Sequence, residues 1–236
     1  PGAQQRRYLP ARAFDELPRR LPIMVNARGV AEGVGIHGPH RVQHRWPHRR
    51  CRIMVKISPQ TTMITLLTDF GTADHFAGVL KGVIASLAPG VPVLDLTHEV
   101  PPYEILTAAF LLEQSWRYFP PGTIHVAVVD PGVGSARRPL LIEAGKHFFI
   151  GPDNGLFSFV LRDESAEVRV LDQPRYWLPN PSSTFHARDI FAPAAAHLAR
   201  GTTPATLGSR IVDPLRSPAV APVRVSRRSY AGAVLH

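Results

Sequence analysis

Four short segments of the chain place ionisable or amide side chains on turns that follow apolar runs. The side chains most suited to chemistry are Asp69, Asp130, Arg137, Asn154 and His186. Proteins of the α/β class build their sites on the loops that follow their strands, so these residues are candidates for one site. An aspartate, an arginine and a histidine together can hold a water molecule and take or steer its proton.

The acidic and aromatic residues nearer the N-terminus suit a nucleoside. Asp69 closes the first apolar run, where a carboxylate can accept hydrogen bonds from the two hydroxyls of a ribose. A turn or helix-cap role for Asp69 is equally consistent with the sequence, and Asp74 can either assist it or cap the next helix. Tyr103 follows two prolines and is either an aromatic lid on a base or the start of a helix.

Structural roles compete with each functional interpretation. Arg137 stands beside Arg138, which alone is typical of a surface arginine, and a lone histidine such as His186 is more often packed or solvated than catalytic. Asn154 lies in an ordinary turn sequence before Gly155. After residue 62 the chain has no H-E-x-x-H, C-x-x-C or EF-hand pattern, so no metal site is expected.

The apolar spacing predicts alternating strands and helices in the first half of the domain. Strands are expected at 63–68, 91–96 and 123–129, with helices at 75–87 and 103–119 between them. This alternation is typical of a mostly parallel sheet with helices on both faces. The predicted fold class is therefore α/β.

Strands become denser in the second half. A hairpin is expected across Gly145-Lys146. The expected elements are strands at 140–144, 147–150 and 168–171, helices at 156–161 and 188–199, and the opening of another strand at 231–235. Beyond Gly201 the chain is rich in proline, so residues 202–236 are expected to form a linker and one further strand.

The positive charge of the chain lies almost wholly in its first quarter. The sequence has 27 Lys and Arg against 18 Asp and Glu; residues 1–62 hold twelve basic and three acidic residues, and residues 63–236 hold fifteen of each. A nucleic-acid partner is therefore not expected for the domain. Residues 1–62 are interpreted as a disordered or non-native leader, with an organelle transit peptide as the alternative, and Met63 as the natural start.

Cysteine usage and hydropathy favour an intracellular protein. The sole cysteine, Cys51, lies in the leader, so the domain has no disulfide framework. No apolar run reaches the length needed to span a membrane, and no secretory signal is present. A cytoplasmic location without a membrane partner is expected.

Four segments in order resemble the S-adenosylmethionine (SAM) hydroxide adenosyltransferases, which are SAM hydrolases related to fluorinase and chlorinase. The segments are 68–71, 129–134, 152–155 and 185–193, and the resemblance covers residues 63–236. It implies an α/β domain at 63–201 and a smaller C-terminal β domain, assembled as a homotrimer with the site between subunits. The chain ends as that second domain would begin, so the C-terminal domain is expected to be largely missing.

The resemblance also implies roles for individual residues. Asp130, Arg137 and His186 match a water-handling triad. The implied substrate-binding residues are Asp69, Asp74, Tyr103, Asn154 and Phe185, where Tyr103 flanks the substrate and Phe185 forms a pocket wall. Ala187 stands where the hydrolases usually carry glycine, and its methyl group is expected to crowd the water site.

The implied reaction is hydrolysis of SAM to adenosine and L-methionine by water attacking ribose C5′. It needs no cofactor or metal, because the sulfonium leaves as a neutral thioether. Three alternatives remain: a halide-using adenosyltransferase, a non-catalytic adenosine or SAM sensor, and a nucleic-acid binder acting through the leader. Asp130 and His186, which the halogenases replace, favour water over halide, as does the short link at Gly145-Lys146 where fluorinase has a long insertion.

Overall fold

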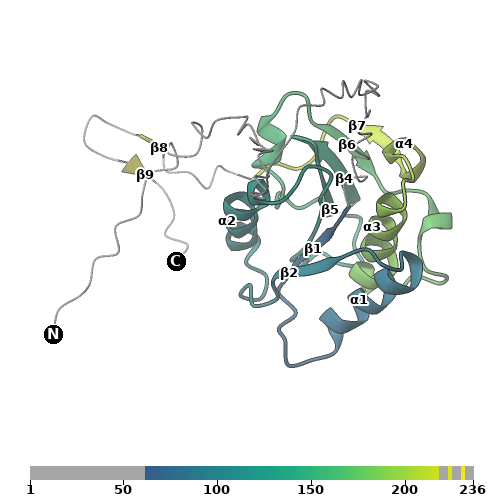
Figure 1. The fold of residues 1–236 in the computed structure, drawn as a ribbon. Helices are drawn as coiled ribbons and strands as arrows, with labels where there is room; N and C mark the ends of the chain where they lie inside the picture. Colours follow the sequence, from purple (N-terminus) through teal and green to yellow (C-terminus); the bar gives the residue numbers. More distant parts are fainter. Residues whose placement is uncertain (1–61, 218–222, 225–229, 232–236) are drawn as a thin grey trace, which may run out of the picture. The chain divides into compact units, whose positions relative to one another are not determined.

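A seven-stranded sheet forms the centre of the structure (Figure 1). The computed structural model describes residues 62–217, 223–224 and 230–231. The strands lie in the order β2-β1-β3-β5-β4-β6-β7. Their bounds are β1 (Ile64–Thr68), β2 (Val93–Thr97), β3 (Ile124–Val128), β4 (Pro139–Ala144), β5 (His147–Pro152), β6 (Glu167–Val170) and β7 (Ser209–Ile211).

One half of this sheet is parallel and the other is antiparallel. Strands β2, β1, β3 and β5 pair in parallel, whereas β4 pairs antiparallel with β5 and β6, and β7 pairs antiparallel with β6. Gly145 and Lys146 join β4 to β5 with φ of 56° and 66°. Two consecutive left-handed residues are what a two-residue type I′ hairpin needs, so the expected hairpin is confirmed.

Helices cover both faces of the sheet, as Figure 1 shows. Helices α1 (Phe76–Leu87) and α3 (Ala192–Ala199) pack on one face, and α2 (Ile105–Ser115) packs on the other. Successive strand residues point to opposite faces, so Leu66 joins the core under α1 while Leu67 joins the core under α2. Both leucines are fully buried.

Several shorter elements complete the described structure. Three are 3₁₀ helices: η2 (Trp116–Tyr118), η3 (Val160–Arg162) and η4 (Pro174–Tyr176). A π-helical turn, η5 (Ala187–Phe191), leads into α3, and α4 (Pro204–Leu207) precedes β7. Two short strands, β8 (Val223–Arg224) and β9 (Tyr230–Ala231), pair with each other.

The expected α/β class with flanking helices is confirmed, but the sheet is mixed and not mostly parallel. The strands and helices expected before residue 200 are present within a few residues of their predicted bounds, except that 156–161 forms turns and part of η3. The region from residue 202 contains α4 and β7, which were not predicted, and β7 extends the sheet. The strand expected at 231–235 lies mostly outside the described residues.

Candidate functional site

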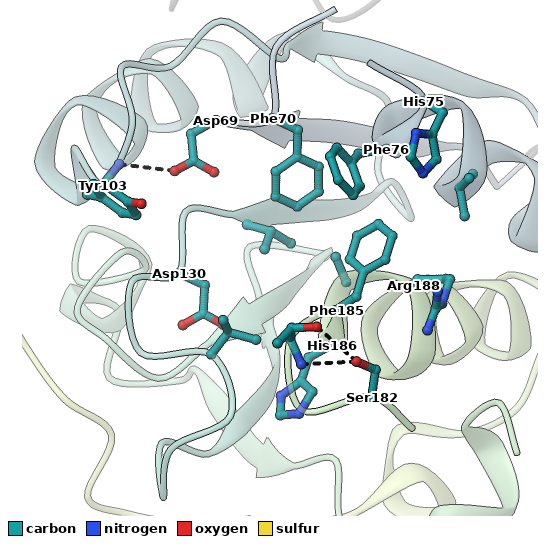
Figure 2. Close-up of a pocket in the computed structure, with 15 residues that line it drawn as sticks. Asp69, Phe70, His75, Phe76, Tyr103, Asp130, Ser182, Phe185, His186 and Arg188 are labelled. Carbon is teal, nitrogen blue, oxygen red and sulfur yellow. Dashed lines mark hydrogen bonds between the residues drawn. The ribbon is translucent and has the colours of Figure 1, made fainter. Parts of the chain in front are cut away.

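A cavity of about 530 Å³ lies at the ends of β1 and β3. Its walls come from the β1–α1 connection, the residues after β3, Tyr103 and the segment 182–188. Figure 2 shows Asp69 and Tyr103 on one side of it, with His75 and Arg188 on the other. The volume is in the range of small-molecule sites, and the position is where α/β folds bind ligands.

Asp130, Arg137 and His186 converge beside this cavity. Arg137 Nε donates to Oδ1 and Oδ2 of Asp130 at 3.0 and 2.8 Å, and Arg137 Nη2 also donates to Oδ2. The same Nη2 donates to Nδ1 of His186 at 3.0 Å. The side chains of Asp130 and Arg137 are 6% and 7% exposed, so this is a buried charge pair. The convergence expected from the sequence is therefore present.

A close backbone approach brings His186 to the other two residues. The loop from Asp130 to Arg137 passes against Ser183 at Gly134, which has φ of 78°. A Cβ atom at Gly134 would lie 2.3 Å from the carbonyl oxygen of Ser183. Only glycine combines this conformation with this approach.

His186 is held as a neutral ring. Burial lowers the pKa of His186 below its ordinary value of 6.5, and the Arg137 cation lowers it further, while Asp130 and Asp189 oppose them. Because Nδ1 accepts from Arg137, the neutral ring carries its hydrogen on Nε2. His186 therefore presents a hydrogen-bond donor at Nε2.

One nitrogen of the Arg137 guanidinium makes no hydrogen bond to the described residues. Its Nη1 is buried and has no hydrogen-bond partner among the described residues. The guanidinium also lies 5.2 Å from the centre of the Phe191 ring. A buried donor without a partner is costly in free energy, and Arg137 itself is not among the residues that line the cavity.

Asp69 and Tyr103 form one end of the cavity. The backbone N–H of Tyr103 donates to Oδ2 of Asp69 at 3.0 Å, as Figure 2 shows. Tyr103 has φ of 69°, an uncommon conformation for a bulky residue, and it is 71% exposed. Strained residues cluster at ligand sites, which agrees with the expected role of Tyr103 at the cavity mouth.

An aromatic cluster forms the wall between Asp69 and the segment 182–188. Phe185 packs edge-to-face on Phe70 and Phe76, with ring centres 5.9 and 5.3 Å apart. The guanidinium of Arg188 lies 5.1 Å from the centre of the Phe185 ring. The expected position of Phe185 in a pocket wall is present.

Two predicted substrate-binding residues are not among those that line the cavity. Asp74 is exposed, and its Oδ1 accepts from the backbone N–H and Nδ1 of His75 at 2.8 and 2.7 Å. Asn154 Nδ2 donates to the carbonyl oxygen of Val129 at 2.8 Å, and its Oδ1 accepts from Leu156 N–H at 3.2 Å. Both Asn154 polar groups are thus engaged within the fold.

Sequence reasoning missed other residues that line the cavity. Phe70, Phe76, Ser182, Thr184 and Arg188 all line it. Phe70 and Arg188 lie inside the segments that carried the resemblance, so their proximity to Asp69 and His186 was the available signal. Phe76 lies at the start of α1, where an apolar residue at helical spacing gives no separate sign of a ligand site.

Comparison with known proteins agrees with this geometry. A family model described as the SAM hydroxide adenosyltransferase N-terminal domain matches residues 64–208. The chain belongs to this family. It is 43% identical over 157 residues to a protein of Thermus thermophilus named (R)-S-adenosyl-L-methionine hydrolase, covering 63% of this chain and 61% of that protein. A fluorinase of an Actinoplanes species is 25% identical over 175 residues, covering 64% of this chain and 59% of the fluorinase.

A solved structure supports the same assignment for the fold. A crystal structure titled as an uncharacterized conserved protein from Thermotoga maritima matches with a TM-score of 0.66 and 37% identity, covering 69% of this chain and 64% of that one. This chain spans 52% to 61% of the length of the named hydrolases that it matches. The family match thus describes the α/β part of such proteins.

The described residues contain neither a metal-binding cluster nor a membrane-spanning helix. In residues 62–217 and the two short strand pieces, no three side chains of His, Cys, Asp or Glu are grouped to hold a metal ion. Across the same residues, no helix combines the length and apolar character needed to cross a membrane.

Proposed function

We propose that this protein hydrolyses SAM to adenosine and L-methionine. The observation that carries the proposal is the contact of Asp130, Arg137 and His186 beside a cavity, in a chain of the SAM hydroxide adenosyltransferase family. Relatives 39% to 44% identical are named SAM hydrolases, which supports the same substrate here.

The chemistry requires a well-placed water molecule and little else. The SAM sulfur is a cationic leaving group that departs from ribose C5′ as the neutral thioether of methionine. Water supplies the oxygen that bonds to C5′, and one proton is released. The site must hold the water in line with C5′ at near-attack distance and receive this proton. Neither a cofactor nor a metal is part of the proposed step.

The three polar side chains divide this task. Arg137, which binds both Asp130 and His186, supplies the positive charge that stabilises the developing negative charge on the water oxygen. His186 donates from Nε2 to orient the water, because its Nδ1 accepts from Arg137. Asp130 takes the proton, since it is the one of the three with lone pairs free to accept.

The rest of the cavity suits the nucleoside. The carboxylate of Asp69 accepts from Tyr103 through Oδ2, and Oδ1 has no partner among the described residues. It is therefore available for the ribose hydroxyls. Tyr103 and Phe185 flank the substrate, and we keep Asp74 as a residue that assists from the cavity rim.

We further propose a homotrimer in which a neighbouring subunit covers the site. Tyr103 is 71% exposed and Phe76 is 36% exposed at the cavity wall, so a neighbour would bury apolar surface there. Sedimentation velocity tests this assembly, and a monomer at working concentration would contradict it. A cytoplasmic location is proposed as well, since residues 63–236 contain no cysteine for a disulfide.

Product analysis tests the function. The protein is incubated with SAM in buffer, in buffer with chloride and in buffer with fluoride, and the nucleosides are separated and identified by mass. Adenosine and methionine in all three are expected. A 5′-halo-adenosine would show a halide-using enzyme, and tight SAM binding without any product would show a sensor; either result overturns the proposal.

A further inference from the structure

We propose that Asp153 and Asn154 are positioning residues that fix the two ends of the loop carrying Asp130 and Arg137. The two residues directly follow β5, and neither lines the cavity. The inference rests on the proposed function, because it assigns these residues an effect on the water-handling side chains.

Asn154 binds the start of the loop that carries Asp130 and Arg137. Its Nδ2 donates to the carbonyl oxygen of Val129 at 2.8 Å, and Val129 immediately precedes Asp130. Asn154 Oδ1 accepts from Leu156 N–H at 3.2 Å, which orients the amide. Val129 is fully buried, so its carbonyl has no route to bulk water. Loss of the amide donor would leave that carbonyl unsatisfied.

Asp153 holds the end of the same loop. Its backbone N–H donates to the carbonyl oxygen of Arg138 at 2.9 Å, and Arg138 Nε donates back to Asp153 Oδ2 at 2.8 Å. Arg138 immediately follows Arg137. The Asp153 side chain is 3% exposed, and its other oxygen, Oδ1, accepts from Leu215 N–H at 2.8 Å.

Residues 213–217 complete this arrangement from outside. Arg138 Nη1 donates to Oδ1 of Asp213 at 2.9 Å, and Arg138 Nη2 donates to its carbonyl oxygen at 2.7 Å. Gly155, with φ of 90°, lies so close to Ser217 that a Cβ atom would be 2.0 Å from Oγ. Each residue of Asp153-Asn154-Gly155 thus has a physical reason: the carboxylate binds Arg138 and Leu215, the amide binds Val129 and Leu156, and Gly155 leaves room for Ser217.

These contacts determine where Arg137 points. The loop is anchored through Val129 before Asp130 and through Arg138 after Arg137, so the Arg137 guanidinium has little freedom to leave Asp130 and His186. A displacement of about 1 Å in a positioned group can cost about a hundredfold in rate. Asp153 and Asn154 therefore act on the reaction through Arg137 without touching the substrate.

The test replaces the amide and follows two readouts. Asn154→Ala is made in the full chain, with Gln114→Ala as the matched control because Gln114 carries an amide that is exposed on helix α2. Steady-state kinetics with SAM give kcat and KM, and proton NMR follows the titration of the His186 ring without substrate. The His186→Gln variant identifies the His186 signal. Circular dichroism and thermal melting confirm that each variant folds.

Release of Arg137 predicts a specific pattern. In Asn154→Ala, kcat falls by about 10- to 100-fold while KM changes little. The groups that act on His186 are Arg137, which lowers its pKa, and Asp130 and Asp189, which raise it. Weaker contact with Arg137 therefore moves the His186 titration to higher pH. The Gln114→Ala control changes neither readout.

A second variant, Asp153→Asn, tests the proposal if Asn154→Ala does not fold. Asp153→Asn keeps the shape of the side chain but removes the charge that binds Arg138. Loss of a negative charge alone would move the His186 titration to lower pH, whereas release of Arg137 moves it to higher pH. A shift to higher pH in either folded variant supports the proposal.

The outcomes separate this inference from the proposed function. If the wild-type protein hydrolyses SAM and both variants keep its kcat and its His186 titration, the inference is overturned and the function stands. If no SAM is hydrolysed but the titration shifts as expected, Asp153 and Asn154 hold the loop as argued and the proposed function fails.

Discussion

The Asp130–Arg137 pair places two opposite charges where water has little access. Such a pair stabilises the fold only while both members are present, because a lone buried charge is strongly unfavourable. The bidentate contact also fixes the guanidinium plane, which a lysine could not reproduce. A single contact thus links the stability of the loop to its chemistry.

Asp130→Asn should lose activity and stability together. It places an amide N–H against the Arg137 guanidinium and removes the proton acceptor. We expect kcat to fall by about 10²- to 10⁴-fold and the free energy of unfolding to fall by about 3 kcal/mol. Adenosine release and urea unfolding measure these, with exposed Asp163→Asn as the control. An unchanged kcat would remove Asp130 from the mechanism.

The acid limb of the rate profile should report on His186. Protonation of His186 would put a hydrogen on Nδ1, so that Nδ1 could no longer accept the hydrogen bond from Arg137. It would also place a second cation beside Arg137, so activity requires the neutral ring. The pKa of His186 is lowered by burial and by Arg137, so activity is full above pH 6.5 and is lost as the pH falls below that value. A profile of kcat/KM between pH 4 and 8 measures it. Loss of activity beginning above pH 6.5 would contradict this role.

At the residue scale, the sequence predicted the catalytic candidates but not their hydrogen bonds. The motifs that contain Asp130, Arg137 and His186 were recognisable, and the three meet as expected. That Arg137 donates to Nδ1, which makes His186 a donor through Nε2, depends on side-chain geometry. Asn154 was assigned to substrate, whereas its bonds to Val129 and Leu156 lie within the fold.

Gly78 in helix α1 and Gly151 in strand β5 should respond oppositely to substitution. A Cβ atom at Gly78 in α1 would meet nothing within 4 Å, whereas one at Gly151 in β5 would lie 2.2 Å from the carbonyl oxygen of Ala127. Gly78→Ala should raise the free energy of unfolding by about 0.5–1 kcal/mol, because alanine restricts the unfolded chain.

Gly151→Ala should lower the free energy of unfolding, since neighbouring backbone in β3 has to move. Urea unfolding of both variants beside the wild type gives the comparison. Equal effects of the two substitutions would show that the close approach of β5 and β3 is misplaced.

A buried histidine pair on β3 and β5 should make the sheet sensitive to acid. His125 bonds to Thr65 at 2.8 Å and to His147 at 3.3 Å, and it is fully buried. Burial first, and His147 second, lower the pKa of His125 to about 3. Its contribution to stability is therefore complete above pH 6.5 and is lost as the pH falls towards 3, on the order of 5 kcal/mol in all.

His125→Gln should flatten this pH dependence. Urea midpoints at pH 7, 5 and 4 are compared between wild type and variant, with exposed His75→Gln as the control. The wild type should lose more stability than the variant on acidification. Parallel pH dependences would show that His125 is protonated in the folded state.

At the element scale, the sequence predicted the long apolar strands but not the short polar ones. Strands β1 and β3 are buried along their whole length, so their apolar runs marked them clearly. Strand β7 has three residues, two of them exposed, and no alternation that a sequence could show. It forms because the side of β6 that does not pair with β4 has free backbone hydrogen-bonding groups, which is a property of the folded sheet.

At the scale of the whole molecule, the excess positive charge and the candidate site lie in different parts of the sequence. The excess of basic residues lies within residues 1–62, while the cavity and the contact of Asp130, Arg137 and His186 beside it lie in the neutral part of the chain. The site is at the ends of parallel strands, as in other α/β proteins, and its mouth exposes aromatic rings. The proposed homotrimer comes from the family resemblance and not from composition or spacing, because assembly depends on complementary surfaces.

Single-turnover hydrolysis in H₂¹⁸O tests the central claim most directly. If the side chains of Asp130, Arg137 and His186 deliver water to ribose C5′, mass spectrometry will find ¹⁸O in the 5′-hydroxyl of adenosine and none in methionine. Labelled homoserine beside methylthioadenosine would place the attack on the amino-acid chain, and unlabelled adenosine would exclude water as the nucleophile. Either result would contradict the account.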